Sequence, residues 1–182
     1  MALSTIGTNA VADDAVTATK IADAVALGKV GQVVTDSFTG TESSTSNAAG
    51  DSFTDSSVAA SITPTATSSK IFVSCQINTG ASNYADGSHV GRFTQAISGG
   101  STTVVNVGAT SGNRIEVSSG RGSESQGSNT LLNTHFSFVL SPSTTSAVTV
   151  TYQFARRGNG SATAYINRTG DDGDNIEQQR TA

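Results

Sequence analysis

Few side chains that could carry out catalysis lie near one another in the sequence. The two histidines, His89 and His135, are isolated, and no Cys or Glu pair has the spacing of zinc ligands. Serine is abundant, but no serine lies in a recognisable nucleophile turn. Most Asp and Glu residues fall in predicted loops or near the N-terminus, with Glu116 as the exception, so no carboxylate pair is placed for glycoside cleavage. The sequence therefore predicts no enzymatic activity.

One acidic cluster lies near the C-terminus, in the Gly-rich stretch Gly170–Asn175. Its carboxylates, Asp171, Asp172 and Asp174, are the oxygen ligands that calcium prefers. Their spacing does not match an EF-hand, and no glutamate follows at the twelfth position. We therefore keep a calcium site as a candidate and a hydrated loop as its alternative, and we expect no other metal and no cofactor.

Aromatic side chains that could bind a receptor are scarce, because the chain has three tyrosines and no tryptophan. Tyr84 lies in the predicted loop Ala81–Ser88 and is the candidate for a receptor contact. The alternative is that its ring packs over its own loop. The lone cysteine, Cys75, has no internal disulfide partner and lies in an apolar run, which predicts a buried, inert thiol.

Composition predicts β-structure. Serine and threonine make up 53 of 182 residues, and charged residues only 13%. Threonine favours strands, whereas serine and glycine favour the turns between them. The net charge of −4 and the scattered basic residues argue against nucleic-acid binding. The N-terminus lacks a Sec signal, and no stretch approaches the ~20 apolar residues that span a bilayer.

The first thirty residues differ from the rest of the chain. Their branched apolar residues recur at a spacing of five, at Ile6, Val11, Val16 and Ile21. This period matches neither a helix nor a strand, although a weak amphipathic helix remains an alternative. Several chains wound about one axis would bury such a stripe. We therefore predict an anchoring or intertwining arm over residues 1–30 that binds symmetry mates or a docking groove.

Residues 31–182 consist of short alternating runs separated by turn clusters, which is typical of a β-sandwich or jelly roll. The predicted strands are Gln32–Phe38, Val58–Thr63, Lys70–Asn78, Val90–Ile97, Thr102–Val107, Arg114–Ser118, Thr130–Leu140, Ala147–Arg156 and Thr163–Arg168. Residues 141–146 are predicted to join two of them as a hairpin turn. The fold class is therefore all-β, a jelly-roll-type β-sandwich preceded by a short extended N-terminal arm.

Several motifs, taken in order, resemble phage structural proteins of the tail-fibre-like or virion-appendage type, common in marine phages. At the N-terminus the resemblance lies in Leu3–Val11 and Thr19–Asp23. In the β-domain it lies in Val58–Pro64, Ser68–Val73 and Ala164–Arg168. Each motif is written in common residues, and the order of the motifs carries the resemblance.

This resemblance implies a C1q/TNF-like jelly roll, a homotrimer on the virion, and host-surface recognition or particle stabilisation without catalysis. Family members end with a further apolar strand, whereas this chain ends with Gln178–Ala182. The resemblance therefore leaves open whether a neighbouring element completes that sheet edge.

We expect a virion structural protein that is assembled in the host cytoplasm and exposed on the particle. The leading interpretation is a homotrimeric short fibre, spike or appendage for host attachment. The alternatives are a capsid decoration (cement) trimer that stabilises the head, an extracellular filament subunit, and a carbohydrate-binding module. The expected partners are the chain itself, other virion proteins through the arm, and a host surface glycan or protein. No nucleic-acid partner and no membrane insertion are expected.

Overall fold

The computed structural model describes residues 30–82, 89–109, 111–120, 129–158, 161–171, 173 and 180–181. The predicted stripe residues Ile6, Val11, Val16 and Ile21 lie outside these ranges. The chain divides into two units, Met1–Val33 and Val34–Ala182. The described strands all belong to the second unit.

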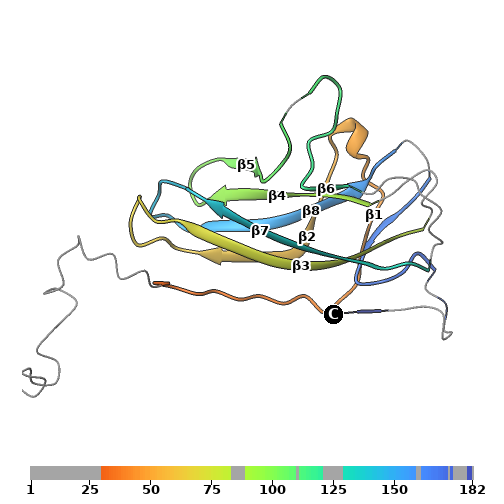
Figure 1. The fold of residues 1–182 in the computed structure, drawn as a ribbon, viewed down its shortest axis with the longest axis horizontal. Coiled ribbons are helices and arrows are strands. Elements are labelled where there is room, and N and C mark those ends of the chain that lie inside the picture. The colour runs from red at the N-terminus through yellow and green to blue at the C-terminus, as the bar shows by residue number, and fades with distance from the viewer. Residues whose placement is uncertain are drawn as a thin grey trace, which may run out of the picture. The chain divides into compact units, whose positions relative to one another are not determined.

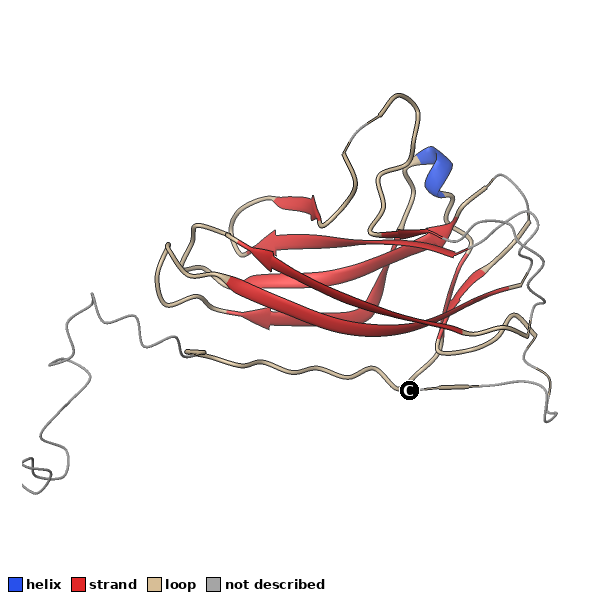
Figure 2. Ribbon diagram, in the orientation of Figure 1, coloured by secondary structure: helices blue, strands red, loops and turns tan. Residues whose placement is uncertain are grey.

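Two antiparallel sheets pack face to face as a sandwich (Figures 1 and 2). Sheet A contains β1, β9, β3 and β7 in that order, and sheet B contains β2, β8, β4 and β5, with β6 also paired to β4. The strands are β1 (Glu42–Ser44), β2 (Thr54–Ile62), β3 (Ile71–Ala81), β4 (His89–Ile97), β5 (Thr102–Val105), β6 (Ser119–Gly120), β7 (Leu132–Leu140), β8 (Val148–Arg156) and β9 (Ala164–Ile166). One 3-10 helix, Ala48–Gly50, follows β1. The predicted all-β sandwich is confirmed.

The core lies between the two sheets and follows from alternation along each strand. In β8 the alternating residues Val148, Val150, Tyr152 and Phe154 lie on one face of the strand and are all buried. The Tyr152 ring lies 5.2 Å, centroid to centroid, from that of Phe93 on the neighbouring strand β4, and 6.0 Å from a β7 ring in the opposite sheet. Each large apolar side chain buried in this way contributes about 1.5–3 kcal/mol.

The connection Ser141–Ser146 is not a hairpin turn, because β7 belongs to sheet A and β8 to sheet B. The segment instead crosses from one sheet to the other, as several other connections of this chain do. Alternation in the sequence shows which face of a strand is buried, but it does not show which strand lies beside it. The prediction of a hairpin at this position was therefore wrong.

Two further strand predictions were wrong, since neither Gln32–Phe38 nor Arg114–Ser118 belongs to a sheet. Conversely, β1 and β6 form in stretches that the sequence marks as turns. β1 exists because Glu42–Ser44 pairs with β9, and this pairing buries the Ser44 side chain. Short strands of Ser and Glu are stabilised by their partner strands and carry no apolar signal of their own.

Candidate functional site

Most of the predicted site residues lie outside the described part of the chain. This holds for the arm stripe and for Tyr84, Asp172 and Asp174, so those predictions stay predictions. Asp171 is described and exposed, and its backbone carbonyl accepts a 2.6 Å hydrogen bond from the Thr169 hydroxyl. Within the described ranges, no group of three His, Cys, Asp or Glu side chains is placed to hold a metal ion.

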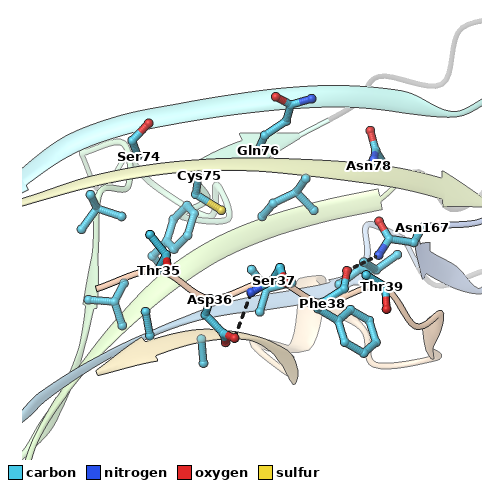
Figure 3. Close-up of a pocket in the computed structure, with 18 of the residues that line it drawn as sticks. Thr35, Asp36, Ser37, Phe38, Thr39, Ser74, Cys75, Gln76, Asn78 and Asn167 are labelled. Atoms are coloured by element: carbon cyan, nitrogen blue, oxygen red, sulfur yellow. Dashed lines mark hydrogen bonds between the residues drawn. The ribbon is translucent and has the colours of Figure 1, made fainter. Parts of the chain in front are cut away.

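A groove opens between β2 of sheet B and β3 of sheet A, and its cavity measures about 470 Å³ (Figure 3). Its walls come from Val58–Ala60 of β2 and Val73–Asn78 of β3. Core side chains Phe93, Val150 and Ile166 also line it. The segment Val34–Thr39, here called the strap, lines the cavity as well. No pattern in the sequence indicates this groove, because its existence depends on which strands are neighbours.

The groove exists because β2 and β3 each leave one edge without a strand partner in the described structure. β3 pairs with β7 along Ile71–Thr79, but on its other side it pairs with β9 only along Thr79–Ala81. β2 pairs with β8 alone. The free edge of β3 and that of β2 therefore border the same cavity.

The backbone groups that face the groove from β3 can be identified from a single hydrogen bond. The Asn167 N–H donates to the Asn78 carbonyl at 2.9 Å, so the polar groups of Asn78 point away from β7. Backbone groups alternate between the two edges of a strand, and no bulge interrupts the pairing of β3 with β7. The N–H and C=O groups of Ser74 and Gln76 therefore face the groove, whereas those of Val73 and Cys75 face β7.

The same reasoning applies to β2. The Ser98 N–H donates to the Ala147 carbonyl at 2.9 Å, so the backbone groups of Ala147 point toward β4 and those of the next residue, Val148, toward β2. Val150 then bonds toward β2, opposite Ala60. The backbone groups of Ala59 and Ser61 consequently face the groove.

The strap runs past these edges in an extended conformation, and it forms no β-bridge with either of them. Its side chains are exposed apart from Phe38, which is partly buried and packs against the core. Figure 3 shows the strap with β3 on one side of it and β2 on the other. The strap therefore covers the groove without completing either sheet.

Asn167 fixes the C-terminal end of the strap. Its side-chain amide donates to the carbonyls of Phe38 and Gly40, at 2.9 and 3.0 Å. The residue is buried and has a φ of 59°, in the left-handed region that Asn tolerates better than most residues. Between Val34 and Ser37 the strap has no comparable hydrogen bond to the sandwich; the Ser37 N–H donates to its neighbour, the Asp36 carboxylate.

Cys75 points from β3 toward the groove, opposite in direction to Ser74 and Gln76 (Figure 3). Its side chain is partly buried, whereas the sequence predicts a buried, inert thiol. Burial raises the pKa of the thiol above its ordinary value. The thiol therefore stays protonated near neutral pH and is a poor nucleophile there.

The two histidines occupy different environments and do not form a catalytic pair. His89 is buried, and its Nε2 lies 2.9 Å from the hydroxyl of Tyr152. Both side chains are buried, so this hydrogen bond lies in the core. Burial also raises the pKa of Tyr152. His135 is exposed on the other sheet, with Nε2 3.1 Å from the Ser74 hydroxyl.

The outward side of β3 and β7 forms a second notable surface, here called the sheet A face. It is made by Phe72, Ser74, Gln76, Asn78, Asn133, His135, Ser137 and Val139. Phe72 and Val139 lie directly opposite each other and are 68% and 59% exposed. No Lys, Arg, Asp or Glu belongs to this set; Lys70 lies just ahead of β3 and donates to Ser141.

The outward side of sheet B is different in character. Arg92 forms a 2.7 Å ion pair with Asp51 and also donates to Gln153. Gln153 in turn donates to the Asp55 carboxylate. A charged network therefore covers sheet B, whereas the sheet A face is uncharged apart from its one histidine. The signal in the sequence was Phe72, an aromatic residue at a position where the alternation of β3 requires an outward side chain.

No helix in the described ranges is both long enough and apolar enough to cross a membrane. No protein-family model, curated protein or solved structure matches this chain.

Proposed function

We propose that this chain is a structural subunit of a phage virion surface, assembled as a homotrimer through the sheet A face. The observation that carries the assembly is the uncharged character of that face, with Phe72 and Val139 exposed side by side. The motifs that resemble virion appendage proteins support the location on the particle.

The physical reason is the cost of burying charge. Burying a face in a trimer desolvates every group on it, and around the three-fold axis it brings like charges of the copies near one another. The sheet A face has no acidic or basic side chain to desolvate apart from His135, and it gains from covering Phe72 and Val139. The Arg92–Asp51 network makes sheet B the less favourable face for a symmetric contact.

In this proposal the assembly has a mechanical role, and catalysis has no part in it. Three copies present three sets of Ser- and Gly-rich loops on one rigid support, and linked weak contacts gain avidity for a host surface. The favoured form is a short fibre, spike or appendage used in attachment. A capsid decoration trimer is the alternative, and immunogold labelling of purified particles distinguishes the two by labelling the tail or the head.

The same substitution at two exposed strand positions tests the assembly. Val139→Glu places a charge on the sheet A face, and Val104→Glu places one on β5 of sheet B, where the valine is 39% exposed. Light scattering should show a trimer for the wild type and for Val104→Glu, and a lower mass for Val139→Glu. Equal masses for the two variants would contradict the proposed interface, and a monomeric wild type would contradict the homotrimer.

A further inference from the structure

We propose that the groove between β2 and β3 receives a β-strand from the N-terminal arm, residues 1–29, of a second copy of this chain. The inserted strand adds to the free edge of β3 and fills the cavity. The inference rests on the proposed self-assembly and goes beyond it, because it assigns the arm a specific acceptor site.

The first argument is the set of backbone groups along the groove. Ser74 and Gln76 of β3 and Ala59 and Ser61 of β2 direct their N–H and C=O groups to it, and no described segment pairs with them. Unpaired strand edges are templates for a further strand. A small molecule would not match donors and acceptors repeated along two edges, whereas an extended peptide does.

The free part of β2 is limited to its C-terminal half. Upstream, the Ser57 N–H donates to the Glu42 carboxylate at 3.0 Å, and its hydroxyl donates to the same group at 2.7 Å. The Ser56 hydroxyl bonds back to the Tyr152 carbonyl at 2.7 Å, within an irregularity of the β2–β8 pairing. These bonds occupy one end of the edge, so the site for an added strand lies along Ala59–Ile62 and the facing part of β3.

The second argument is the space that the strap leaves unfilled. The cavity of about 470 Å³ is roughly three times the ~150 Å³ cavity that holds one benzene molecule, so it admits several small apolar side chains. The strap does not fill this cavity, because its C-terminal end is held by the hydrogen bonds from the Asn167 amide to the carbonyls of Phe38 and Gly40. An additional segment is therefore needed to close this side of the core.

The third argument identifies the segment. Ahead of Val30 the chain has 29 residues, which span roughly 95 Å when extended, enough to reach a neighbouring copy. The strap lines the groove without a turn, so a copy's own arm would have to reverse direction ahead of the strap before it could enter its own groove. The arm also carries branched apolar residues such as Ile21 and Val25, which an extended strand places on one face, where they suit the apolar lining.

Disulfide cross-linking of the full chain tests this inference, because Cys75 lines the groove and is the only native cysteine. One chain carries Cys75→Ser together with a new cysteine in the arm at Val11, Val16 or Ile21. It is co-assembled with wild-type chains that carry a different tag. The matched control places the new cysteine at Val104 on sheet B.

Under mild oxidation, at least one arm position should give a disulfide that links the two differently tagged chains, and Val104→Cys should give none. The inference is overturned if no arm position links the chains, or if Ile21→Cys with Cys75 retained forms only an intrachain bond. Light scattering on the same samples separates the two proposals. A trimer without cross-links contradicts the inserted arm alone, whereas a monomer also contradicts the proposed function.

Amide hydrogen exchange gives a second readout that needs no new cysteine. In the assembly, the amides of Ser74 and Gln76 should exchange slowly, and a Val16→Asp substitution in the arm should speed their exchange. The amides of Val73 and Cys75, which bond to β7, should stay protected in both proteins and serve as the internal control. Fast exchange at Ser74 and Gln76 in the intact assembly would overturn the inference.

Discussion

Removing the Asn167 side chain should release the strap from the sandwich. The amide of Asn167 donates to the carbonyl of Phe38 in the strap and to that of Gly40, just after the strap. Two substitutions separate this role from the backbone conformation of the residue. Asn167→Gly removes the amide but tolerates a φ of 59°, whereas Asn167→Ala removes the amide and leaves in the left-handed region a residue that tolerates it less well than Asn does.

The magnitudes follow from these contacts. Each intramolecular hydrogen bond contributes about 1 kcal/mol net, so Asn167→Gly should lower the free energy of unfolding by about 1–2 kcal/mol. Ala lacks the polar side chain that lets Asn occupy the left-handed region and pays roughly 1–2 kcal/mol there, so Asn167→Ala should lose about 2–4 kcal/mol in total. Both losses are large fractions of the ~5–15 kcal/mol stability of a typical domain.

Urea unfolding followed by far-ultraviolet circular dichroism measures these differences, at one fixed protein concentration because assembly adds to apparent stability. The midpoints should fall in the order wild type, Asn167→Gly, Asn167→Ala, with similar slopes. Two variants as stable as the wild type would show that the amide does not hold the strap. Equal midpoints for Gly and Ala would refute the left-handed conformation.

Three further outcomes are expected. Gly80→Ala should lower the free energy of unfolding in urea by about 1–3 kcal/mol, because the new Cβ would overlap the Arg168 carbonyl. Gly108→Ala is the control: it has open space around it and should change the free energy of unfolding by less than ~0.5 kcal/mol. Tyr152→Phe should cost about 1–3 kcal/mol by the same assay, because it removes the hydroxyl that bonds a buried histidine. Burial raises the pKa of the Cys75 thiol above 9.0, so the thiol of the unfolded chain loses its proton at a lower pH than that of the native protein. The free energy of unfolding should therefore fall as the pH rises through 9. A thiol reagent should also react more slowly with the native than with the unfolded protein. Stability that stayed constant between pH 8 and 10, or equal labelling rates, would contradict the burial of this thiol.

Local patterns in the sequence predicted the parts of the fold that depend on a single strand. The alternation in β8 identified four buried residues, because a side chain's face is set by its position in the strand. Pairing between strands was not predictable in this way. The segment Ser141–Ser146 has the composition of a hairpin turn but joins strands of opposite sheets. Gln32–Phe38 has the composition of a strand but finds no partner edge in the described structure.

The candidate surfaces show the same limit. An outward Phe72 could be recognised from the alternation of β3, but its partner Val139 became known only from the register between β3 and β7. The groove could not be predicted, because it results from two strands that lack neighbours on the same side. The hydrogen bond from the Asn167 amide to the Phe38 carbonyl joins residues that are 129 positions apart in the sequence. Nothing in the sequence around either residue indicates this contact.

The solution mass of the unmodified full chain, measured by light scattering across a range of concentrations, tests the proposed assembly most directly. A homotrimer gives three times the 18.3 kDa chain mass, held constant as the protein is diluted through the micromolar range. A mass of one chain at every concentration would contradict self-assembly through the sheet A face.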